Sequence, residues 1–307
     1  MSSENRQPHV GAGRYAPSPT GDLHLGNLRT ALLAWAAARN TGRAFYLRLE
    51  DLDRARARDP QPQVDDLAAL GIDWDGEVVV QSQRLDRYQE ALDSLRDAGL
   101  VFECFCSRRD IREASSAAHT PPGAYPGTCI DLSEGERQRR RVALAKAGRA
   151  PALRLRPRVE QWTVHDTNYG EFTGPVENVV LQRGDGEFAY NLAVVVDDVA
   201  MGVDQIVRGD DLLSSAPLHS YLARELGGAA PTFGHVPLIL GPTGQRLAKR
   251  DGAVTLRELR SQGTTVPEVV EMLGKSVNLG RVRTAAGFRQ ALRETPLPTS
   301  PWTYVPT

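Results

Sequence analysis

The pattern of apolar and polar positions is clearest between residues 13 and 35. Apolar side chains recur there at three- and four-residue intervals, at Leu25, Leu28, Leu32 and Trp35. This spacing predicts a helix that buries one stripe of its surface. The residues before it are typical of a short strand, 13–16, which ends in the proline- and glycine-containing segment 17–21. We expect Thr20 or Asp22 to cap the helix.

A strand, a turn and a helix N-terminus together form a favourable site for an anion. The free backbone N–H groups and the positive end of the helix dipole both face the ligand. His24 and Asn27 fall in the predicted first turn, and Gly26 lets another group approach the backbone closely. An ordinary first strand–helix unit has the same outline, so this pattern alone leaves both interpretations open.

The next strand covers residues 44–50 and places Glu50 at its carboxyl end. In open α/β sheets, ligands bind outside the carboxyl ends of the strands, so Glu50 is placed to meet a substrate ammonium group. The alternative is a strand-end acid that caps the following segment. Residues 61–72 and 84–99 then have the apolar spacing of helices.

Strand patterns resume in the second half of the chain. Residues 188–198 hold a continuous apolar run, which is typical of a strand buried on both faces. The predicted strand 205–213 carries Arg208, and residues 235–240 form another strand. Helical patterns then cover residues 253–292. Together these elements predict an α/β fold with a parallel sheet.

The segment between the two sets of strands contains all three cysteines of the chain, Cys104, Cys106 and Cys129. An odd number argues against a disulfide framework. Three thiolates suit a tetrahedral Zn²⁺, with metal–sulfur distances of about 2.3 Å. Tyr125, His119 or water can supply the fourth ligand. Three free buried thiols without a metal are the alternative.

Arginine-rich stretches in the same segment are candidate contacts for RNA. Residues 131–149 predict a charged helix, which has either a solvated face or a patch for tRNA phosphates. Arg154, Arg156 and Arg158 alternate along a strand-like run, so one face can carry three guanidinium groups. The chain has a net charge of −1, so any RNA contact must come from such local patches.

The composition is that of an ordinary globular protein, with 24% charged and 41% hydrophobic residues. Neither a signal-peptide core nor a membrane-spanning stretch is present, so we expect a cytoplasmic protein. Only three of the 37 basic residues are lysines, which makes Lys249 informative. It lies with Arg246 in the glycine-containing segment 241–252, and loops of this kind can close on a polyphosphate.

The start of the chain resembles that of the class I glutamyl-tRNA synthetases. The match is RYAPSPTG at residues 14–21, followed by HLGN at residues 24–27. The resemblance implies ATP contacts for three residues of the first helical turn, His24, Gly26 and Asn27. It implies an amino-acid pocket that contains Arg14 and Ser18. Asn27 departs from the His-Ile-Gly-His pattern of the family.

The pocket implied by this resemblance is complementary to glutamate. The segment LRLEDLD at residues 47–53 is a second match and favours a substrate role for Glu50, while Tyr190 and Arg208 match further pocket positions. Glutamate carries two carboxylates and one ammonium group, which suit two arginines, one acid and one hydroxyl group. We expect Arg14 to take the side-chain carboxylate, although the sequence does not settle which arginine takes which group.

Residues 241–252 resemble the second class I motif, Lys-Met-Ser-Lys-Ser. Lys249 stands at its second lysine, Arg246 at its first lysine and Ala248 at its central serine. The resemblance implies ATP contacts for Arg246 and Lys249, and catalytic roles for His24 and Lys249. The ammonium group of Lys249 can neutralise the charge that develops as pyrophosphate leaves.

The cysteine pattern and the length of the chain refine the resemblance. Cys-x-Cys followed by Tyr-x3-Cys resembles the structural zinc site in the inserted domain of the bacterial family, which implies that Tyr125 is the fourth ligand. Only 58 residues follow Lys249, so we expect no anticodon-binding domain. The implied parts are a Rossmann catalytic domain in two halves (10–99 and 179–252), an inserted acceptor-binding-like module with the zinc site (100–178) and a helical stem-contact-like segment (253–307).

A shortened catalytic body with this insertion resembles the glutamyl-Q tRNA(Asp) synthetases. The resemblance implies a monomer that activates L-glutamate with ATP and Mg²⁺ and transfers it to the queuosine base at the wobble position of tRNA(Asp). Two alternatives stay open: a minimal conventional glutamyl-tRNA synthetase that charges a tRNA 3′ end, and a non-catalytic tRNA-binding regulatory paralogue. The second predicts decayed catalytic positions, yet the implied residues are all present: Arg14, His24, Glu50, Arg208 and Lys249.

Overall fold

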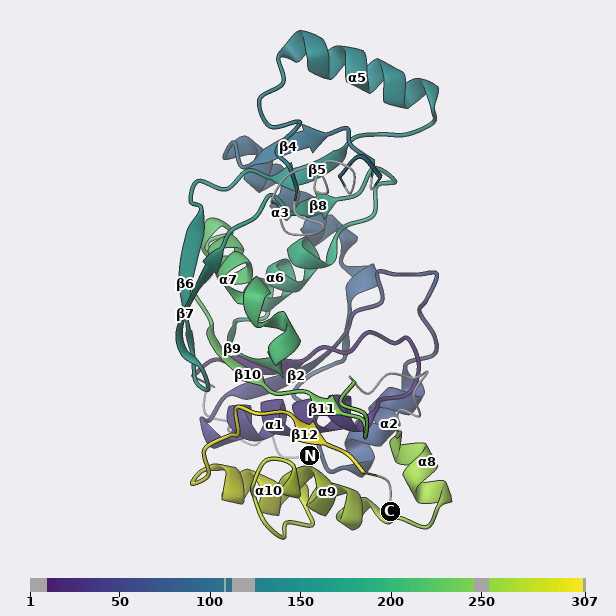
Figure 1. Cartoon of the computed structure of the whole chain (residues 1–307), viewed down its shortest axis with the longest axis vertical. Helices are drawn as coiled ribbons and strands as arrows, with labels where there is room; N and C mark the ends of the chain where they lie inside the picture. Colours follow the sequence, from purple (N-terminus) through teal and green to yellow (C-terminus); the bar gives the residue numbers. More distant parts are fainter. Residues whose placement is uncertain (1–9, 108, 112–124, 246–253, 306–307) are drawn as a thin grey trace, which may run out of the picture.

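The structure is a computed structural model, and it describes residues 10–107, 109–111, 125–245 and 254–305. The molecule is elongated, with a large sheet and the C-terminal helices towards one end and helix α5 (Glu134–Lys146) at the other (Figure 1). No helix in these ranges is both long and apolar enough to cross a membrane.

A seven-stranded sheet forms the centre of the larger part, and all of its strands except β7 run parallel. Its spatial order is β3 (Val79–Val80), β2 (Ala44–Leu49), β1 (Ala12–Tyr15), β9 (Val203–Gly209), β10 (Thr232–Val236), β6 (Gln161–Asp166) and β7 (Gly170–Pro175). The chain leaves β1 towards β2 on one side and later returns to its other side with β9. The topological switch point, where ligands bind in such sheets, therefore lies at the carboxyl ends of β1 and β9.

Helices cover both faces of this sheet (Figure 1). One face packs against α1 (Leu25–Asn40), α2 (Gln61–Ala69), α8 (Leu256–Ser261), α9 (Val266–Lys275) and α10 (Ala285–Leu292). The hydrophobic core beyond the other face is built around α3 (Leu85–Asp97), α6 (Tyr190–Ala200) and α7 (Ala216–Glu225). Two 3₁₀ turns, Gln81–Gln83 and Asp210–Ser215, and the short pair β11 (Ile239–Leu240) and β12 (Trp302–Thr303) complete this part.

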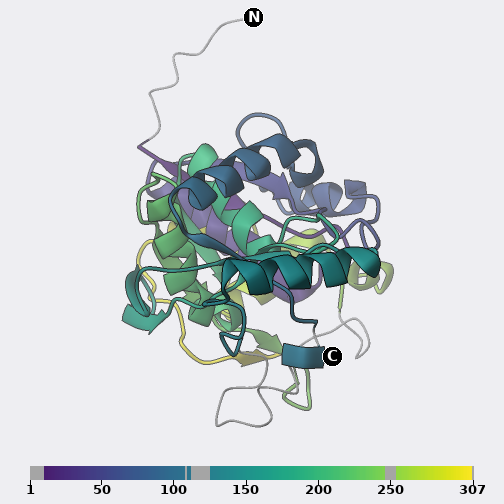
Figure 2. The same ribbon diagram turned by 90° about the horizontal axis from the view of Figure 1, so that it is seen from above.

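A smaller antiparallel sheet carries the cysteine-containing segment. Its strands are β4 (Val101–Cys104), β5 (Ala152–Leu155) and β8 (Val180–Gln182). Helix α5 lies beyond this sheet and crosses in front of the molecule in the view from above (Figure 2). It buries none of its residues, which supports the interpretation of its charged surface as a solvated face.

The predicted α/β class with a parallel sheet is confirmed, and so are the helices expected near 25–35, 61–72, 84–99, 131–149 and 253–292. The strand expected at 188–198 is wrong, because this segment forms α6. Seven consecutive residues of α6, from Leu192 to Asp198, are buried. A helix enclosed on several sides loses its amphipathic pattern, so a short apolar run does not distinguish it from a buried strand.

Candidate active site

A cavity of about 540 Å³ opens at the carboxyl ends of the central strands, at the switch point of the sheet. A volume of this size suits a small-molecule ligand. Most of the site residues expected from the sequence line it: Ser18, His24, Gly26, Asn27, Glu50, Tyr190 and Arg208. Arg14 is buried behind this cavity, where its Nε donates to Asp198 at 3.2 Å.

His24 caps helix α1, so the expectation of a cap at Thr20 or Asp22 is wrong. The imidazole Nδ1 accepts hydrogen bonds from the backbone N–H groups of Gly26 at 3.1 Å and Asn27 at 3.3 Å. The Asn27 side chain in turn accepts from the His24 backbone N–H at 3.3 Å. A ring nitrogen that accepts carries no proton, so the proton of the neutral imidazole lies on Nε2. The helix N-terminus thus keeps a neutral N–H donor at the cavity.

Arg48 holds the acid at the end of β2 in place. Its guanidinium group is completely buried and pairs with Glu50 at 3.1 Å and with Asp198 at 2.7 Å. Burial raises the pKa of Glu50, and the nearby charges of Arg48 and Arg14 oppose that rise. Sequence reasoning missed Arg48, whose only local signal is a charged residue inside an otherwise apolar strand.

Asp197 is a second buried acid beside this cluster. Its carboxylate accepts from Arg84 Nε at 2.6 Å, from the Tyr88 hydroxyl at 2.8 Å and from Gln81 Nε2 at 2.9 Å. These donors come from the segment before α3 and from α3 itself, so the charge network ties that helix to α6. The buried cluster, three arginines against three acids, consists of Arg14, Arg48, Arg84, Glu50, Asp197 and Asp198.

Arg208 differs from these arginines because its hydrogen-bond partners are neutral. Its side chain is only 5% exposed, and Nε donates to His235 Nε2 at 2.9 Å. One terminal nitrogen contacts His219 Nδ1 at 2.9 Å, and the other donates to the Leu212 carbonyl at 2.9 Å. The ion pairs among the described residues do not include Arg208, and burial lowers its pKa to about 10. A buried cation without a counter-charge is costly, so the site suits an anion.

His219 and His235 give the folded chain a dependence on pH. Burial, followed by the charge of Arg208, lowers the pKa of His219, and burial also lowers that of His235. Below about pH 6.5 the unfolded chain binds protons that the folded chain excludes. We therefore expect the free energy of unfolding to decrease as the pH falls below about 6.5, with each histidine contributing at most about 1.4 kcal/mol per pH unit.

Urea unfolding measured between pH 7.5 and 5 checks this expectation. His219→Gln should flatten the profile, whereas His165→Gln, at a side chain that is 61% exposed, should leave it unchanged. Equal slopes for wild type and His219→Gln would contradict the assignment.

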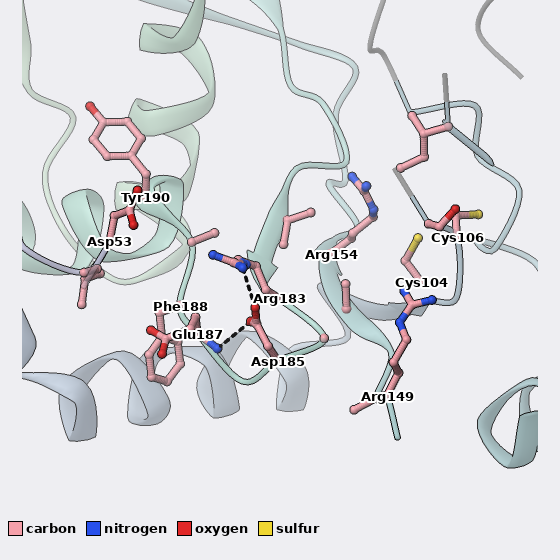
Figure 3. Close-up of a pocket in the computed structure, with 18 of the residues that line it drawn as sticks. Asp53, Cys104, Cys106, Arg149, Arg154, Arg183, Asp185, Glu187, Phe188 and Tyr190 are labelled. Carbon is pink, nitrogen blue, oxygen red and sulfur yellow. Dashed lines mark hydrogen bonds and ion pairs between the residues drawn. The ribbon is translucent and has the colours of Figure 1, made fainter. Parts of the chain in front are cut away.

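A second cavity of about 860 Å³ leads from the first towards the cysteine cluster. The two share Ser18, Glu50 and Tyr190. In Figure 3, Tyr190 and Asp53 lie at one end of this cavity and the cysteines at the other. Charged side chains line the path between them: Arg149, Arg154, Arg183, Asp185 and Glu187. The cavity therefore connects the switch point of the large sheet with the small one.

The sulfur atoms of Cys104, Cys106 and Cys129 all lie within 4.8 Å of one another. The Sγ atoms of Cys106 and Cys129 are 3.6 Å apart, close to the roughly 3.8 Å that tetrahedral bonds of 2.3 Å to a metal require. The Tyr125 hydroxyl lies beside them, since it accepts from the Cys129 backbone N–H at 2.8 Å. This set of three sulfurs and one oxygen can hold a metal ion. His119, the other protein candidate, lies outside the described residues.

Arg246, Ala248 and Lys249 also lie outside the described residues. The chain that follows them is anchored at the first cavity, because the Val254 carbonyl accepts from the Leu25 N–H at 3.0 Å. Thr255 forms a strand-like bridge with His24. The first described residues after the expected Lys-Met-Ser-Lys-Ser-like motif, Val254 and Thr255, therefore lie against the N-terminus of α1.

The expectation of three guanidinium groups on one face of the 154–158 run is wrong. Arg154 is buried, donates to the Asn178 carbonyl and lies 4.2 Å from the centre of the Tyr125 ring. Arg156 and Arg158 follow the end of β5, and they pair with acids in different parts of the chain, Asp131 before α5 and Glu225 at the end of α7. Strand alternation stops at residue 155, so the three side chains diverge.

Comparisons with known proteins agree with this geometry. Residues 12–277 match the family of tRNA synthetases class I (E and Q), catalytic domain. A glutamyl-Q tRNA(Asp) synthetase of Nocardia farcinica is 58% identical over 88% of this chain and 85% of that protein. Another, of Cutibacterium acnes, is 47% identical over 88% of this chain and 77% of that protein. A glutamate-tRNA synthetase structure from Elizabethkingia anophelis shares the fold, with a TM-score of 0.82 and 24% identity over 96% of this chain and 68% of its own.

Proposed function

The chain belongs to the glutamyl-Q tRNA(Asp) synthetases, ligases of the aminoacyl-tRNA synthetase type, and we propose how its residues glutamylate queuosine in tRNA(Asp). The enzyme activates L-glutamate with ATP and transfers it to the queuosine base at the wobble position. The single observation that supports the amino-acid choice best is Arg208, a buried cation held by neutral groups at the cavity. The charges of the six-residue cluster behind it cancel, and the charge of Arg208 is not paired with an acid of the described residues, so Arg208 can pair with a glutamate carboxylate.

The glutamate pocket combines Arg208, Glu50, Tyr190 and Ser18, which line one cavity. We assign a substrate carboxylate to Arg208 and the ammonium group to Glu50, whose side chain lies at the mouth of the buried cluster. Tyr190 supplies a hydroxyl group between them. The assignment of the side-chain carboxylate to Arg14 stays a prediction, and the ion pair of Arg14 with Asp198 favours a supporting role.

In the first step, an oxygen of the glutamate α-carboxylate forms a bond to the α-phosphorus of ATP. The bond from that phosphorus to the bridging oxygen breaks, and pyrophosphate leaves. We assign the triphosphate to the part of the cavity lined by His24, Gly26 and Asn27, where the His24 ring N–H and the helix N-terminus favour an anion. Arg246 and Lys249, with Mg²⁺ that accompanies ATP, neutralise the developing charge.

In the second step, a hydroxyl oxygen of the queuosine cyclopentenediol forms a bond to the activated carbonyl carbon. AMP leaves with the electron pair of the broken bond, and the hydroxyl proton passes to the solvent. The cavity of about 860 Å³ that joins the glutamate pocket to the small sheet supplies a path for the acceptor. Holding both reactants in one geometry supplies most of the rate.

We assign one structural Zn²⁺ per chain to Cys104, Cys106, Cys129 and Tyr125. When bound, zinc fastens the loop after β4 to the segment before α5, and it takes no part in the chemistry. His119 or a water molecule is the alternative fourth ligand, and the following test distinguishes these alternatives from Tyr125.

Tyr125→Phe is expected to weaken zinc binding by roughly 10- to 100-fold or more. Loss of a side chain that only hydrogen-bonds to a metal ligand already costs this much affinity, and Tyr125 is assigned as a ligand itself. Chelator competition with the purified protein measures the affinity. His119→Ala is the matched control and should bind zinc as the wild type does. An affinity that changes for His119→Ala but not for Tyr125→Phe would assign the fourth position to histidine.

We further propose that the enzyme acts as a monomer in the cytoplasm, where ATP and tRNA are present. The large apolar side chains exposed in the described ranges lie in separate parts of the chain: Val10, Leu85, Val142, Tyr190 and Val305. The division into catalytic halves (10–99 and 179–252), an inserted module (100–178) and a helical segment (253–307) is proposed with it.

Glutamate acceptance from ATP tests the proposed function, with tRNA(Asp) bearing queuosine, tRNA(Asp) lacking it and tRNA(Glu) as separate acceptors. We expect only the first to be charged. Charging of tRNA(Glu) alone would indicate a conventional synthetase. Absence of glutamate-dependent ATP–pyrophosphate exchange would indicate a non-catalytic paralogue.

A further inference from the structure

The imidazole rings of His235 and His219 contact the guanidinium group of Arg208, and the other nitrogen of each ring contacts a further polar side chain. His235 on β10 faces Asp166 at the end of β6, with 2.6 Å between Nδ1 and the carboxylate oxygen. His219 on α7 faces Asn191 on α6, with 2.9 Å between Nε2 and the amide oxygen. Asp166, His219 and His235 are all at least 97% buried. The proposed function uses none of these four supporting side chains.

The hydrogen bonds fix the protonation of both rings. Arginine only donates, so His235 Nε2 and His219 Nδ1 must both be unprotonated where they meet Arg208. The His235 proton therefore lies on Nδ1 and is donated to Asp166, and the His219 proton lies on Nε2 and is donated to Asn191. The two rings thus hold opposite tautomers of neutral imidazole.

Asp166 is itself held firmly. One carboxylate oxygen accepts from the backbone N–H groups of Asn168 at 2.8 Å and Tyr169 at 2.9 Å, at the turn between β6 and β7. The other oxygen also accepts from the His235 backbone N–H at 3.0 Å. The turn therefore orients the carboxylate, the carboxylate orients the ring, and the ring orients Arg208.

Because the groups that accept hydrogen bonds from Arg208 are neutral, they do not cancel its positive charge, as carboxylates would. The guanidinium groups of Arg14 and Arg48 are held by carboxylates, which cancel their charge. The imidazoles also hold the Arg208 guanidinium group by hydrogen bonds but leave its positive charge, and the Asp166 carboxylate is separated from Arg208 by the His235 ring. His219 also contacts the Tyr190 ring, with 5.8 Å between the ring centres, so the same imidazole touches two groups of the pocket.

We propose that His219 and His235 are positioning residues that aim Arg208 at a substrate carboxylate while keeping its charge free of a protein acid. This inference rests on the proposed function, because the carboxylate is that of glutamate. It goes beyond that function because it makes the affinity for glutamate depend on His219 and His235, which do not contact the substrate.

Three variants at His219 separate position from charge. His219→Gln retains a neutral acceptor, and we expect its KM for glutamate in ATP–pyrophosphate exchange to stay within about threefold of wild type. His219→Leu removes the acceptor, and the KM for glutamate should rise about tenfold or more, because a hydrogen bond to a charged group is lost. His219→Glu holds Arg208 through an ion pair and should raise that KM at least as much, because the pair cancels the charge. The KM for ATP should stay unchanged in all three.

The decisive comparison is His219→Glu with His219→Gln. If the network served packing or position alone, the two variants would bind glutamate equally well, and that result would overturn the proposal. His165→Glu, at an exposed position of β6, is the matched control and should retain wild-type constants. Thermal unfolding of each variant identifies any that fail to fold.

A measurement on the wild type keeps the inference testable whatever the variants do. Nitrogen-15 NMR of the six histidine side chains reports each tautomer. We expect one Nδ1–H ring, His235, and one buried Nε2–H ring, His219, both neutral at pH 6.5. A doubly protonated ring at either position would overturn the proposal. If the wild type showed these tautomers but no glutamate-dependent ATP–pyrophosphate exchange, the proposed function would be refuted instead.

Discussion

Replacement of Arg208 by glutamine is expected to lower kcat/KM for glutamate in ATP–pyrophosphate exchange by about 100- to 1,000-fold. Arg208 is a buried cation at the cavity whose described hydrogen-bond partners are neutral, so a bound carboxylate supplies its counter-charge. Glutamine can still accept or donate one hydrogen bond but brings no charge. The substrate carboxylate would then be desolvated without a cation to pair with, which costs several kcal/mol.

The comparison with a matched variant makes this prediction specific. Arg156→Gln removes the same charge at an exposed ion pair with Asp131, and we expect it to leave the exchange constants for glutamate unchanged. The KM for ATP should be similar in both variants. An equal loss for ATP and glutamate in Arg208→Gln would mean that Arg208 supports the whole site rather than one carboxylate.

The sequence was sufficient to predict the residues at the strand ends. Glu50 follows one strand of the central sheet and Arg208 lies near the end of another, and the carboxyl ends of parallel strands meet at one edge. The cysteine pattern was equally informative, because a short spacing brings Cys104 and Cys106 together and leaves only Cys129 to be supplied by the fold. In both cases the position of a residue within its strand or motif predicts which other residues lie close to it in the fold.

Other features have no local signal. The cap at His24 looks like any residue before a helix, and only the extended backbone and the ring orientation turn its Nδ1 towards the N–H groups. Helix α6 is buried so completely that its apolar residues lack a helical period. The network of Asp166, His235 and His219 joins residues up to 69 positions apart through side chains that are individually unremarkable in sequence.

Arg48 illustrates the same limit in energetic terms. An arginine on a strand is usually a surface residue, and nothing near position 48 reveals that its main partner lies 150 residues further along the chain. The partner Asp198 is itself part of a helix that sequence patterns mistake for a strand. The desolvation cost of burying Arg48 is offset only when β2 and α6 pack together and bring Asp198 next to it. The role of either side chain therefore cannot be predicted from its own position in the sequence.

Replacement of Arg48 by methionine is expected to lower the free energy of unfolding by about 3–5 kcal/mol. Methionine fills much of the volume but leaves the buried carboxylates of Glu50 and Asp198 without their common cation. Urea unfolding at pH 7.5 measures the change. Arg183→Met, at an exposed pair with Asp185, is the matched control and should change stability by less than about 1 kcal/mol.

The double variant Arg48→Met/Asp198→Asn tests whether charge balance is the cause. The native cluster holds three arginines and three acids, so the single variant leaves one surplus negative charge beside the glutamate pocket. Asp198→Asn removes that charge and should recover part of the lost stability, because substitutions in contact with each other are not additive. We also expect Arg48→Met to weaken glutamate binding, because the surplus acid would offset the charge of Arg208, and Asp198→Asn should restore part of that affinity. Fully additive losses would mean that Arg48 acts through packing rather than through charge.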